Sequence, residues 1–347
     1  MKQLQSLGRC LGWCAAALLA TASAKAGPLE ELKSLSQLPG IDLAKLKGGE
    51  ILTQRGPEGN FARGISAASC YFVHASIAVV GEQLLHWDPT KHPRSDSRLY
   101  REYGFPSPRV AFQTLRLDQS IPNDRWLLDH TLGIADGVAA DNLHLTAAEV
   151  KLIRQDVPKK GAASPQARVA RANDVWGEIL RRRSDSLGRG GIAAVAPYDS
   201  NPSISPGSEF RGLLTLNAAA AKHFRPVLNA KPLTASGASA DEAVGYWETT
   251  IVRGHTTLQL GLFSARKSAI SWQLADCVYY PTDTYFMALD VYQLWPVDGG
   301  TLVWQVSFVS APFRTYLGGV DRYIAGKQLT QETLDTIKTF RAAVERR

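Results

Sequence analysis

This 347-residue sequence has few cysteines, no strong excess of one charge and, beyond its first residues, no long apolar run. Four cysteines are too few for a disulfide-rich secreted scaffold. The 39 basic residues exceed the 32 acidic ones by only seven and are spread along the chain, which argues against a nucleic-acid partner. A membrane-spanning helix needs about 20 apolar residues, so we expect no stable span after residue 26.

The sequence also lacks the common catalytic and metal-binding motifs. Its seven histidines form no H-E-x-x-H pattern, and no G-x-S-x-G is present, so we predict neither a metal site nor a cofactor. Ser264 and Lys267 match S-x-x-K, but that serine nucleophile must start a helix. Here the segment is predicted to be a turn between strands, so binding is favoured over catalysis and enzymatic activity is left open.

The first 26 residues have the pattern of an export signal. Lys2 and Arg9 precede an apolar run over 11–22, and small residues follow at Ala24 and Ala26. This order is typical of a cleaved signal peptide, and an N-terminal membrane anchor is the alternative. We therefore predict a periplasmic or secreted protein, with residues 27–347 forming a single α+β domain.

Two cysteines, Cys70 and Cys277, remain after such cleavage, and both lie in apolar, strand-like segments. In an oxidising compartment they could form a disulfide. The alternative is a pair of buried free thiols that pack as small apolar side chains. The sequence leaves both possibilities open.

The first half of the chain predicts a helix near its start and then a strand–helix unit. Pro28 and the leucines after it indicate a short helix. A strand is expected over 64–75, with Ser76 as N-cap of a helix over 77–87 that ends at Asp88-Pro89.

Residues 105–240 are rich in proline and glycine and are predicted to be a largely helical and irregular insertion. Thr146 and Glu149 form a capping box. A second amphipathic helix over 169–180 leads into Arg181–Arg183, which we expect on a solvated helix face; an anionic partner surface is the alternative.

Residues 246–310 predict five antiparallel strands, over 246–252, 256–263, 270–280, 285–295 and 301–310. Asp298-Gly299 is a strong hairpin signal, and pairing Val297 with Gly300 separates an apolar from a polar face. The apolar face carries Leu289, Val291, Trp295, Leu302, Trp304, Val306 and Phe308, interrupted by Gln293. The polar face carries Asp290, Tyr292, Thr301, Gln305 and Ser307.

The apolar face needs a cover, which we predict to be a C-terminal helix capped by Thr330. Its predicted buried stripe consists of Leu334, Ile337, Phe340, Ala342 or Ala343, and Val344. The fold class is therefore α+β, with an antiparallel meander packed on a C-terminal helix.

This element order resembles the START-like, or helix-grip, superfamily. The resemblance rests on the strand through Cys70, the helix after Ser76, the meander over 246–310 and the final helix, and the long insertion departs from it. It implies a cavity between sheet and helix that binds an apolar small molecule or lipid. The predicted ligand-binding residues are Leu289, Val291, Trp295, Trp304, Phe308 and Phe340.

Two other hypotheses are kept. In the first, the protein is an envelope enzyme that uses Glu248 and Asp290 as acid and base. The favoured alternative for these two carboxylates is that they face water or bind an arginine such as Arg314. In the second, it is a structural or interaction protein whose insertion docks on a partner. The sequence does not fix the oligomeric state.

Overall fold

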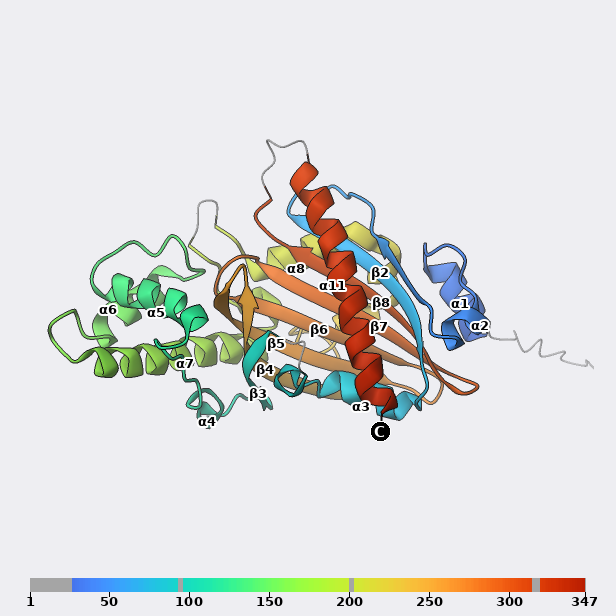
Figure 1. Cartoon of the computed structure of the whole chain (residues 1–347), viewed down its shortest axis with the longest axis horizontal. Helices are drawn as coiled ribbons and strands as arrows, with labels where there is room; N and C mark the ends of the chain where they lie inside the picture. Colours follow the sequence, from blue (N-terminus) through green and yellow to red (C-terminus); the bar gives the residue numbers. More distant parts are fainter. Residues whose placement is uncertain (1–26, 93–95, 200–202, 314–318, 347) are drawn as a thin grey trace, which may run out of the picture.

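The computed structural model describes residues 27–92, 96–199, 203–313 and 319–346. The predicted signal peptide and Arg314 lie outside the described residues. One antiparallel sheet of eight strands organises the chain, in the order β1-β2-β8-β7-β6-β5-β4-β3 (Figure 1). The α+β fold class is confirmed. The strands are β1 (Ile51–Arg55), β2 (Gly64–Val73), β3 (Ser97–Tyr103), β4 (Glu242–Val252), β5 (His255–Lys267), β6 (Trp272–Pro281), β7 (Met287–Val297) and β8 (Gly300–Ser310).

The predicted register of the last hairpin is confirmed. Val297 pairs with Gly300, and the pairing continues through Trp295 with Leu302 and Leu289 with Phe308. Gly299 adopts a φ of +82°, which glycine reaches without steric cost, at the turn between the strands. Because paired residues point to the same side, the two sets of side chains separate as expected.

One side of the sheet carries the C-terminal helix α11 (Val320–Glu345) and the short helix α3 (Ile77–Leu85), and we call it the α11 face. The helix α11 packs on β1 and β2, whereas α3 contacts β5–β8 (Figure 1). Close packing of α3 depends on Gly81, where a Cβ would lie only 2.2 Å from Cε3 of Trp272. Ser76 caps α3 as predicted.

The predicted N-cap of the C-terminal helix, Thr330, is wrong, because the N-cap of α11 is Gly319, eleven residues earlier. The Thr330 hydroxyl donates to the Gly326 carbonyl inside the helix, so it is not an N-cap. Of the predicted stripe, Ile337, Phe340 and Val344 are buried, whereas Leu334, Ala342 and Ala343 are half-buried. Thr333 is buried in place of Leu334.

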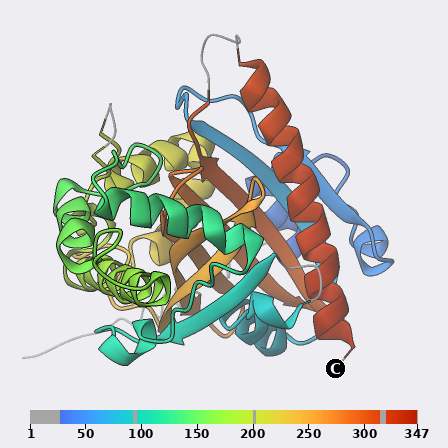
Figure 2. The same ribbon diagram turned by 60° about the vertical axis from the view of Figure 1, so that its left-hand side comes forward.

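The insertion covers the other side of the sheet, which we call the insertion face (Figure 2). The helices α5, α8 and α10 contact strands between β5 and β8. The sequence analysis predicted that the C-terminal helix covers the apolar face of the last hairpin. This prediction is wrong, because the insertion covers that face. The helices of the insertion are α4 (Arg109–Phe112), α5 (Pro122–Ala135), α6 (Ala147–Asp156), α7 (Pro165–Gly190), α8 (Pro206–Leu214), α9 (Ala218–His223) and α10 (Arg225–Leu228), with 3-10 turns η2 (Ile192–Ala194) and η3 (Thr215–Asn217).

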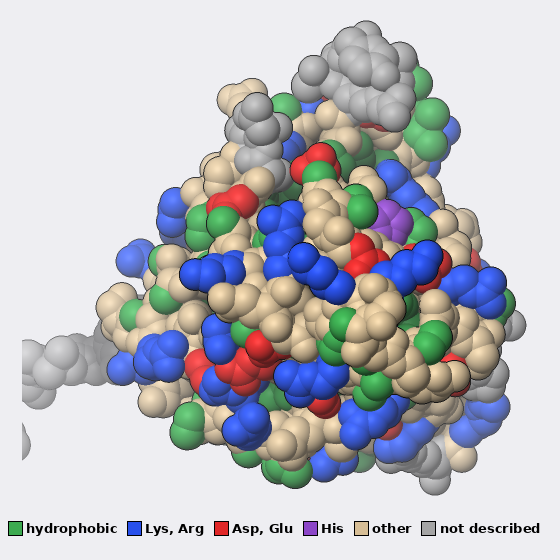
Figure 3. Space-filling view, turned by 90° about the vertical axis from the view of Figure 1, so that its left-hand side faces the viewer, with side chains coloured by type: hydrophobic (Ala, Val, Ile, Leu, Met, Phe, Trp, Pro, Cys, Tyr) green, Lys and Arg blue, Asp and Glu red, His purple; other side chains and the backbone are tan. Residues whose placement is uncertain are grey.

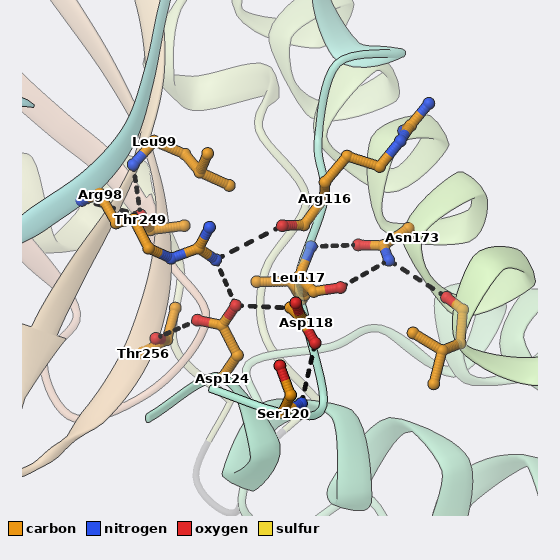
Figure 4. A network of polar contacts seen from close by, with 11 residues as sticks. Arg98, Leu99, Arg116, Leu117, Asp118, Ser120, Asp124, Asn173, Thr249 and Thr256 are labelled. Atoms are coloured by element: carbon orange, nitrogen blue, oxygen red, sulfur yellow. Dashed lines mark hydrogen bonds and ion pairs between the residues drawn. The ribbon is translucent and has the colours of Figure 1, made fainter. Parts of the chain in front are cut away.

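The buried carboxylate of Asp124 joins the insertion to the edge of the sheet (Figure 4). It lies in the first turn of α5, accepts from the Thr256 hydroxyl at 2.7 Å and from the Asp118 backbone at 2.9 Å, and pairs with Arg98 of β3. Nearby, Asn173 of α7 bonds both the N–H and the carbonyl of Leu117. These bonds hold three segments of the insertion against β3 and β5.

The arginine run at the end of α7 is not uniformly solvated. Arg181 and Arg182 are partly exposed and bond Glu178, at 2.9 and 2.7 Å. Arg183 is buried and forms a bidentate pair with Glu149, the residue that completes the predicted capping box of α6. An arginine can be buried in this way because its charge and its donors are matched by a fixed carboxylate.

Two short helices, α1 (Pro28–Leu35) and α2 (Leu43–Lys47), precede the sheet, and a 3-10 turn, η1 (Pro89–Lys91), follows α3. Cys70 and Cys277 are both buried and unpaired, so the free-thiol alternative is the correct one. Burial raises the pKa of Cys70 to about 12 and leaves it an inert thiol at neutral pH. In the described part of the chain, no helix combines the length and apolar character that crossing a bilayer requires.

Candidate functional site

The six predicted ligand-binding residues do not share one space. Five of them, Leu289, Val291, Trp295, Trp304 and Phe308, lie buried on the insertion face, whereas Phe340 packs on the α11 face, across the sheet. The five are packed in a filled core. Trp304, for example, has its ring 5.3 Å from that of Phe224, which directly precedes α10.

The α11 face presents the more reactive set of side chains. Asp276 of β6 pairs in register with Asp290 of β7, which pairs in turn with Ser307 of β8. One step along the strands, Tyr292 pairs with Gln305. Asp276, Asp290 and Tyr292 are half-buried, while Gln305 and Ser307 are buried. The predicted polar face of the last hairpin is therefore an interior surface and not a solvated one.

Specific hydrogen bonds position the two aspartates. Asp290 accepts from Gln305 Nε2 at 3.0 Å and from the Ser307 hydroxyl. Asp276 accepts from the Tyr246 hydroxyl at 2.8 Å. The Tyr246 ring reaches this position only because Gly261 lies beneath it, where a Cβ would come within 2.0 Å of the ring.

The neighbouring carboxyls have different affinities for protons. Burial and the charge of Asp290 raise the pKa of Asp276 well above its usual value. Burial also raises the pKa of Asp290, but the bonds from Ser307 and Gln305 oppose that shift. Asp276 is therefore the carboxyl of the pair that holds a proton more strongly, and Asp290 is the more acidic one.

Glu248 of β4 adds a third half-buried carboxyl to this face, two residues from Tyr246. Burial raises its pKa to about 7, and Asp88 contributes to the shift while a bond with Ser97 opposes it. The charge of Glu248 also raises the pKa of Asp276, which places both carboxyls in one electrostatic environment. The predicted pair of Glu248 and Asp290 thus lies on one face, but the carboxyl beside Asp290 in the sheet is Asp276.

Tyrosines surround the carboxyls. Tyr71, Tyr246, Tyr285 and Tyr292 belong to the apolar cluster of this face, or pack against it, together with Phe263 and Leu274. The carboxylates raise the pKa of each of these tyrosines beyond the effect of burial, so the phenols remain protonated donors. A face with phenol donors, carboxyl acceptors and apolar rings can bind both ends of an amphiphilic molecule.

The middle of the α11 face is only partly covered. The helix α11 lies over β1 and β2, and the middle strands are visible beside it (Figure 1). The half-buried state of Asp276, Asp290, Tyr285 and Tyr292 agrees with this arrangement. We call this area, formed by Asp276, Asp290, Glu248, Tyr246, Tyr285 and Tyr292, the tyrosine–carboxyl site.

A hollow of about 590 Å³ lies on the insertion, beside α6 and α7. Basic and acidic side chains alternate over this side of the molecule (Figure 3). Arg171 pairs with Asp174 at 3.2 Å, and Arg181 pairs with both Glu178 and Asp185. Since these charges satisfy one another, the hollow is a weaker candidate than the tyrosine–carboxyl site.

The S-x-x-K match is not an active site, although its position differs from the expectation. Strand β5 continues through Lys267, so Ser264 and Lys267 lie in a strand and not in a turn. Side chains three residues apart in a strand point to opposite faces. Lys267 therefore cannot take a proton from Ser264.

Comparisons with known proteins add little to this geometry. No family model and no curated protein matches the sequence. The structure titled "Crystal structure of Ara h 8.0201" matches with 12% identity and a TM-score of 0.22, over 41% of this chain and 91% of that chain. A likeness at this TM-score carries no argument about function. An antiparallel sheet with a C-terminal helix on one face is compatible with the predicted helix-grip architecture.

Proposed function

We propose that this is an exported protein of the helix-grip type that binds a small amphiphilic molecule at the tyrosine–carboxyl site. Export is supported by the sequence of residues 1–26. The observation that carries the binding proposal is the Asp276–Asp290 pair, which stays half-buried among tyrosines on a face that α11 covers only in part. Ligand sites are usually apolar surfaces, partly shielded from water, on which a few polar groups converge.

The chemistry of the site defines the class of ligand. Phe263, Leu274 and the tyrosine rings offer an apolar surface for a hydrocarbon or ring. Asp290, whose charged form is favoured by the bonds from Ser307 and Gln305, offers an acceptor in a partly desolvated place, where a cation or a strong donor binds well. The favoured ligand is therefore an apolar molecule with an amine or a hydroxyl group, not the purely apolar one that the sequence suggested.

A pair of fluorescent probes tests this proposal. A dansyl-labelled alkylamine should bind at least about tenfold more tightly than a dansyl-labelled fatty acid, since about 1.4 kcal/mol of charge attraction gives that ratio. Asp290→Asn should abolish the preference, while Asp129→Asn, at an exposed carboxyl of the insertion, should keep it. Equal affinities of the unaltered protein for both probes would refute the proposed role of Asp290.

A second candidate function is proton-transfer catalysis by the same pair. It is favoured by the different proton affinities of adjacent carboxyls, the arrangement that acid–base catalysis requires. Native mass spectrometry of protein purified from its host tests both functions. A bound molecule of unchanged mass in both the unaltered protein and Asp276→Asn supports binding alone, whereas a substrate that accumulates only in the variant supports catalysis.

A further inference from the structure

We propose that Glu82, His86 and Glu242 form a binding site for a divalent transition-metal cation such as Zn²⁺. Glu82 and His86 lie one helical turn apart at the C-terminal end of α3, and Glu242 is the first residue of β4. This site is separate from the tyrosine–carboxyl site and does not depend on the proposed function.

The three side chains already converge. His86 Nε2 lies 3.2 Å from a Glu242 oxygen and 3.9 Å from a Glu82 oxygen, and the candidate ligand atoms all lie within 4.8 Å of one another. Ligand atoms about 2.1 Å from a tetrahedral zinc ion are about 3.4 Å apart. Small side-chain rotations would therefore close the site around an ion.

A carboxylate from a different strand orients the histidine. His86 Nδ1 lies 3.1 Å from Glu102 of β3, which also accepts from the Tyr100 hydroxyl at 3.0 Å. In this structure both ring nitrogens face carboxylate acceptors, since His86 Nε2 also lies 3.2 Å from Glu242. A metal ion would therefore take the place of the Nε2 proton, while Nδ1 keeps its bond to Glu102. Carboxylate–histidine–metal arrangements of this kind are usual in metalloproteins, where the outer carboxylate fixes the ring and raises its basicity.

A positive charge already occupies the place between the carboxylates. Lys267 Nζ lies 2.8 Å from Glu82 and 2.6 Å from Glu242. In the same position the ammonium lies 4.5 Å from the centre of the Trp272 ring, which adds a cation–π contact to the two ion pairs. Lys267 is thus a built-in competitor that the metal must displace.

The ligand set selects the class of ion. Imidazole nitrogen together with carboxylate oxygens suits Zn²⁺ and its first-row neighbours, whereas Mg²⁺ and Ca²⁺ prefer oxygen ligands alone. The side chains of Glu82, His86 and Glu242 are 47%, 40% and 29% exposed, so an ion has access from solvent. A solvent-accessible site with three protein ligands leaves a coordination position for water.

Isothermal titration of chelator-treated, untagged protein with zinc chloride tests the proposal. We expect one zinc ion per chain, no heat from magnesium chloride, and at least about tenfold weaker binding in His86→Gln and in Glu102→Ala. His74→Gln, at an exposed histidine outside the cluster, should bind as the unaltered protein does. Lys267→Met should bind zinc more tightly, because the competing ammonium is gone.

Thermal denaturation in chelator checks that each variant is folded, and zinc should raise the midpoint only in proteins that keep His86. Absence of zinc binding by both the unaltered protein and Lys267→Met would overturn the proposal. Equal affinities of His86→Gln and His74→Gln would overturn it as well, since the zinc would then bind elsewhere.

Discussion

The two faces of the sheet are both interior surfaces, yet they are built from different side chains. The insertion face is lined by Trp, Leu and Phe and is sealed by helices. The α11 face mixes tyrosines with three half-buried carboxyls and is covered only in part. A sealed apolar face contributes stability through burial, whereas polar groups held in a partly desolvated place reduce stability and provide chemistry. We therefore expect the first face to contribute most of the stability, and the proposed function rests on the second.

The largest expected effect comes from Trp304→Ala on the insertion face. Trp304 is fully buried against Phe224, so truncation should lower the free energy of unfolding by about 3–5 kcal/mol and leave binding of the amine probe unchanged. Urea denaturation and a probe titration measure the two quantities. A small loss of stability with a large loss of binding would reverse the assignment of the faces.

Gly261→Ala tests whether the α11 face depends on the position of the Tyr246 ring. The added Cβ would displace the Tyr246 ring from its place above the strand and break its bond to Asp276. We expect a loss of about 1–3 kcal/mol from overpacking, together with weaker probe binding. Gly104→Ala is the matched control, since a Cβ there meets no atom within 4 Å.

Gln305→Ala should lower the stability by about 1–2 kcal/mol, since the variant loses a bond to the charged Asp290. A solvated Gln305 would instead lose well under 1 kcal/mol, the effect typical of an exposed position. Chemical denaturation of Gln305→Ala separates the two cases. Gln331→Ala, at an exposed glutamine of α11, is the control.

The smallest expected effect is a change in pH dependence caused by Glu248→Gln. An acid with a raised pKa favours the folded state while it is protonated, so its contribution is lost as pH rises from its usual 4.5 to about 7. The variant should lose less stability than the unaltered protein over this window, by about 1 kcal/mol after allowance for its partial exposure. Denaturation at pH 4.5 and pH 8 measures the difference, and identical pH profiles would contradict it.

Local patterns predicted local structure well. The alternation around Asp298-Gly299 fixed the strand register, and Ser76 and Thr146 marked helix starts, because each depends on neighbours in sequence. The start of α11 was missed because its first turns have no buried stripe: Val320 and Ile324 are both largely exposed. Without an amphipathic pattern, nothing in those residues indicates where the helix begins.

The sequence could not predict which segment packs on the apolar face of the last hairpin. Alternation shows which residues share a face, but either α11 or the insertion could have packed on the apolar set of the last hairpin. Asp276 was missed for a related reason, since one carboxyl in a strand gains meaning only when the β6–β7 register places it beside Asp290. The available signal was one aspartate in each of two neighbouring apolar strands, β6 and β7, neither of which contains lysine or arginine.

The strand order also separates the two thiols. Cys70 lies in β2 and Cys277 in β6, with β8 and β7 between them. At about 4.8 Å per strand they are at least about 14 Å apart across the sheet, twice the reach of a disulfide, and the register shifts them further apart along the strands. Native folding therefore needs neither an oxidant nor a disulfide isomerase. The chain should refold from denaturant equally well with or without a reducing agent. An oxidised form linking these cysteines would be a misfolded one, which makes the two thiols a built-in reporter of errors in strand pairing.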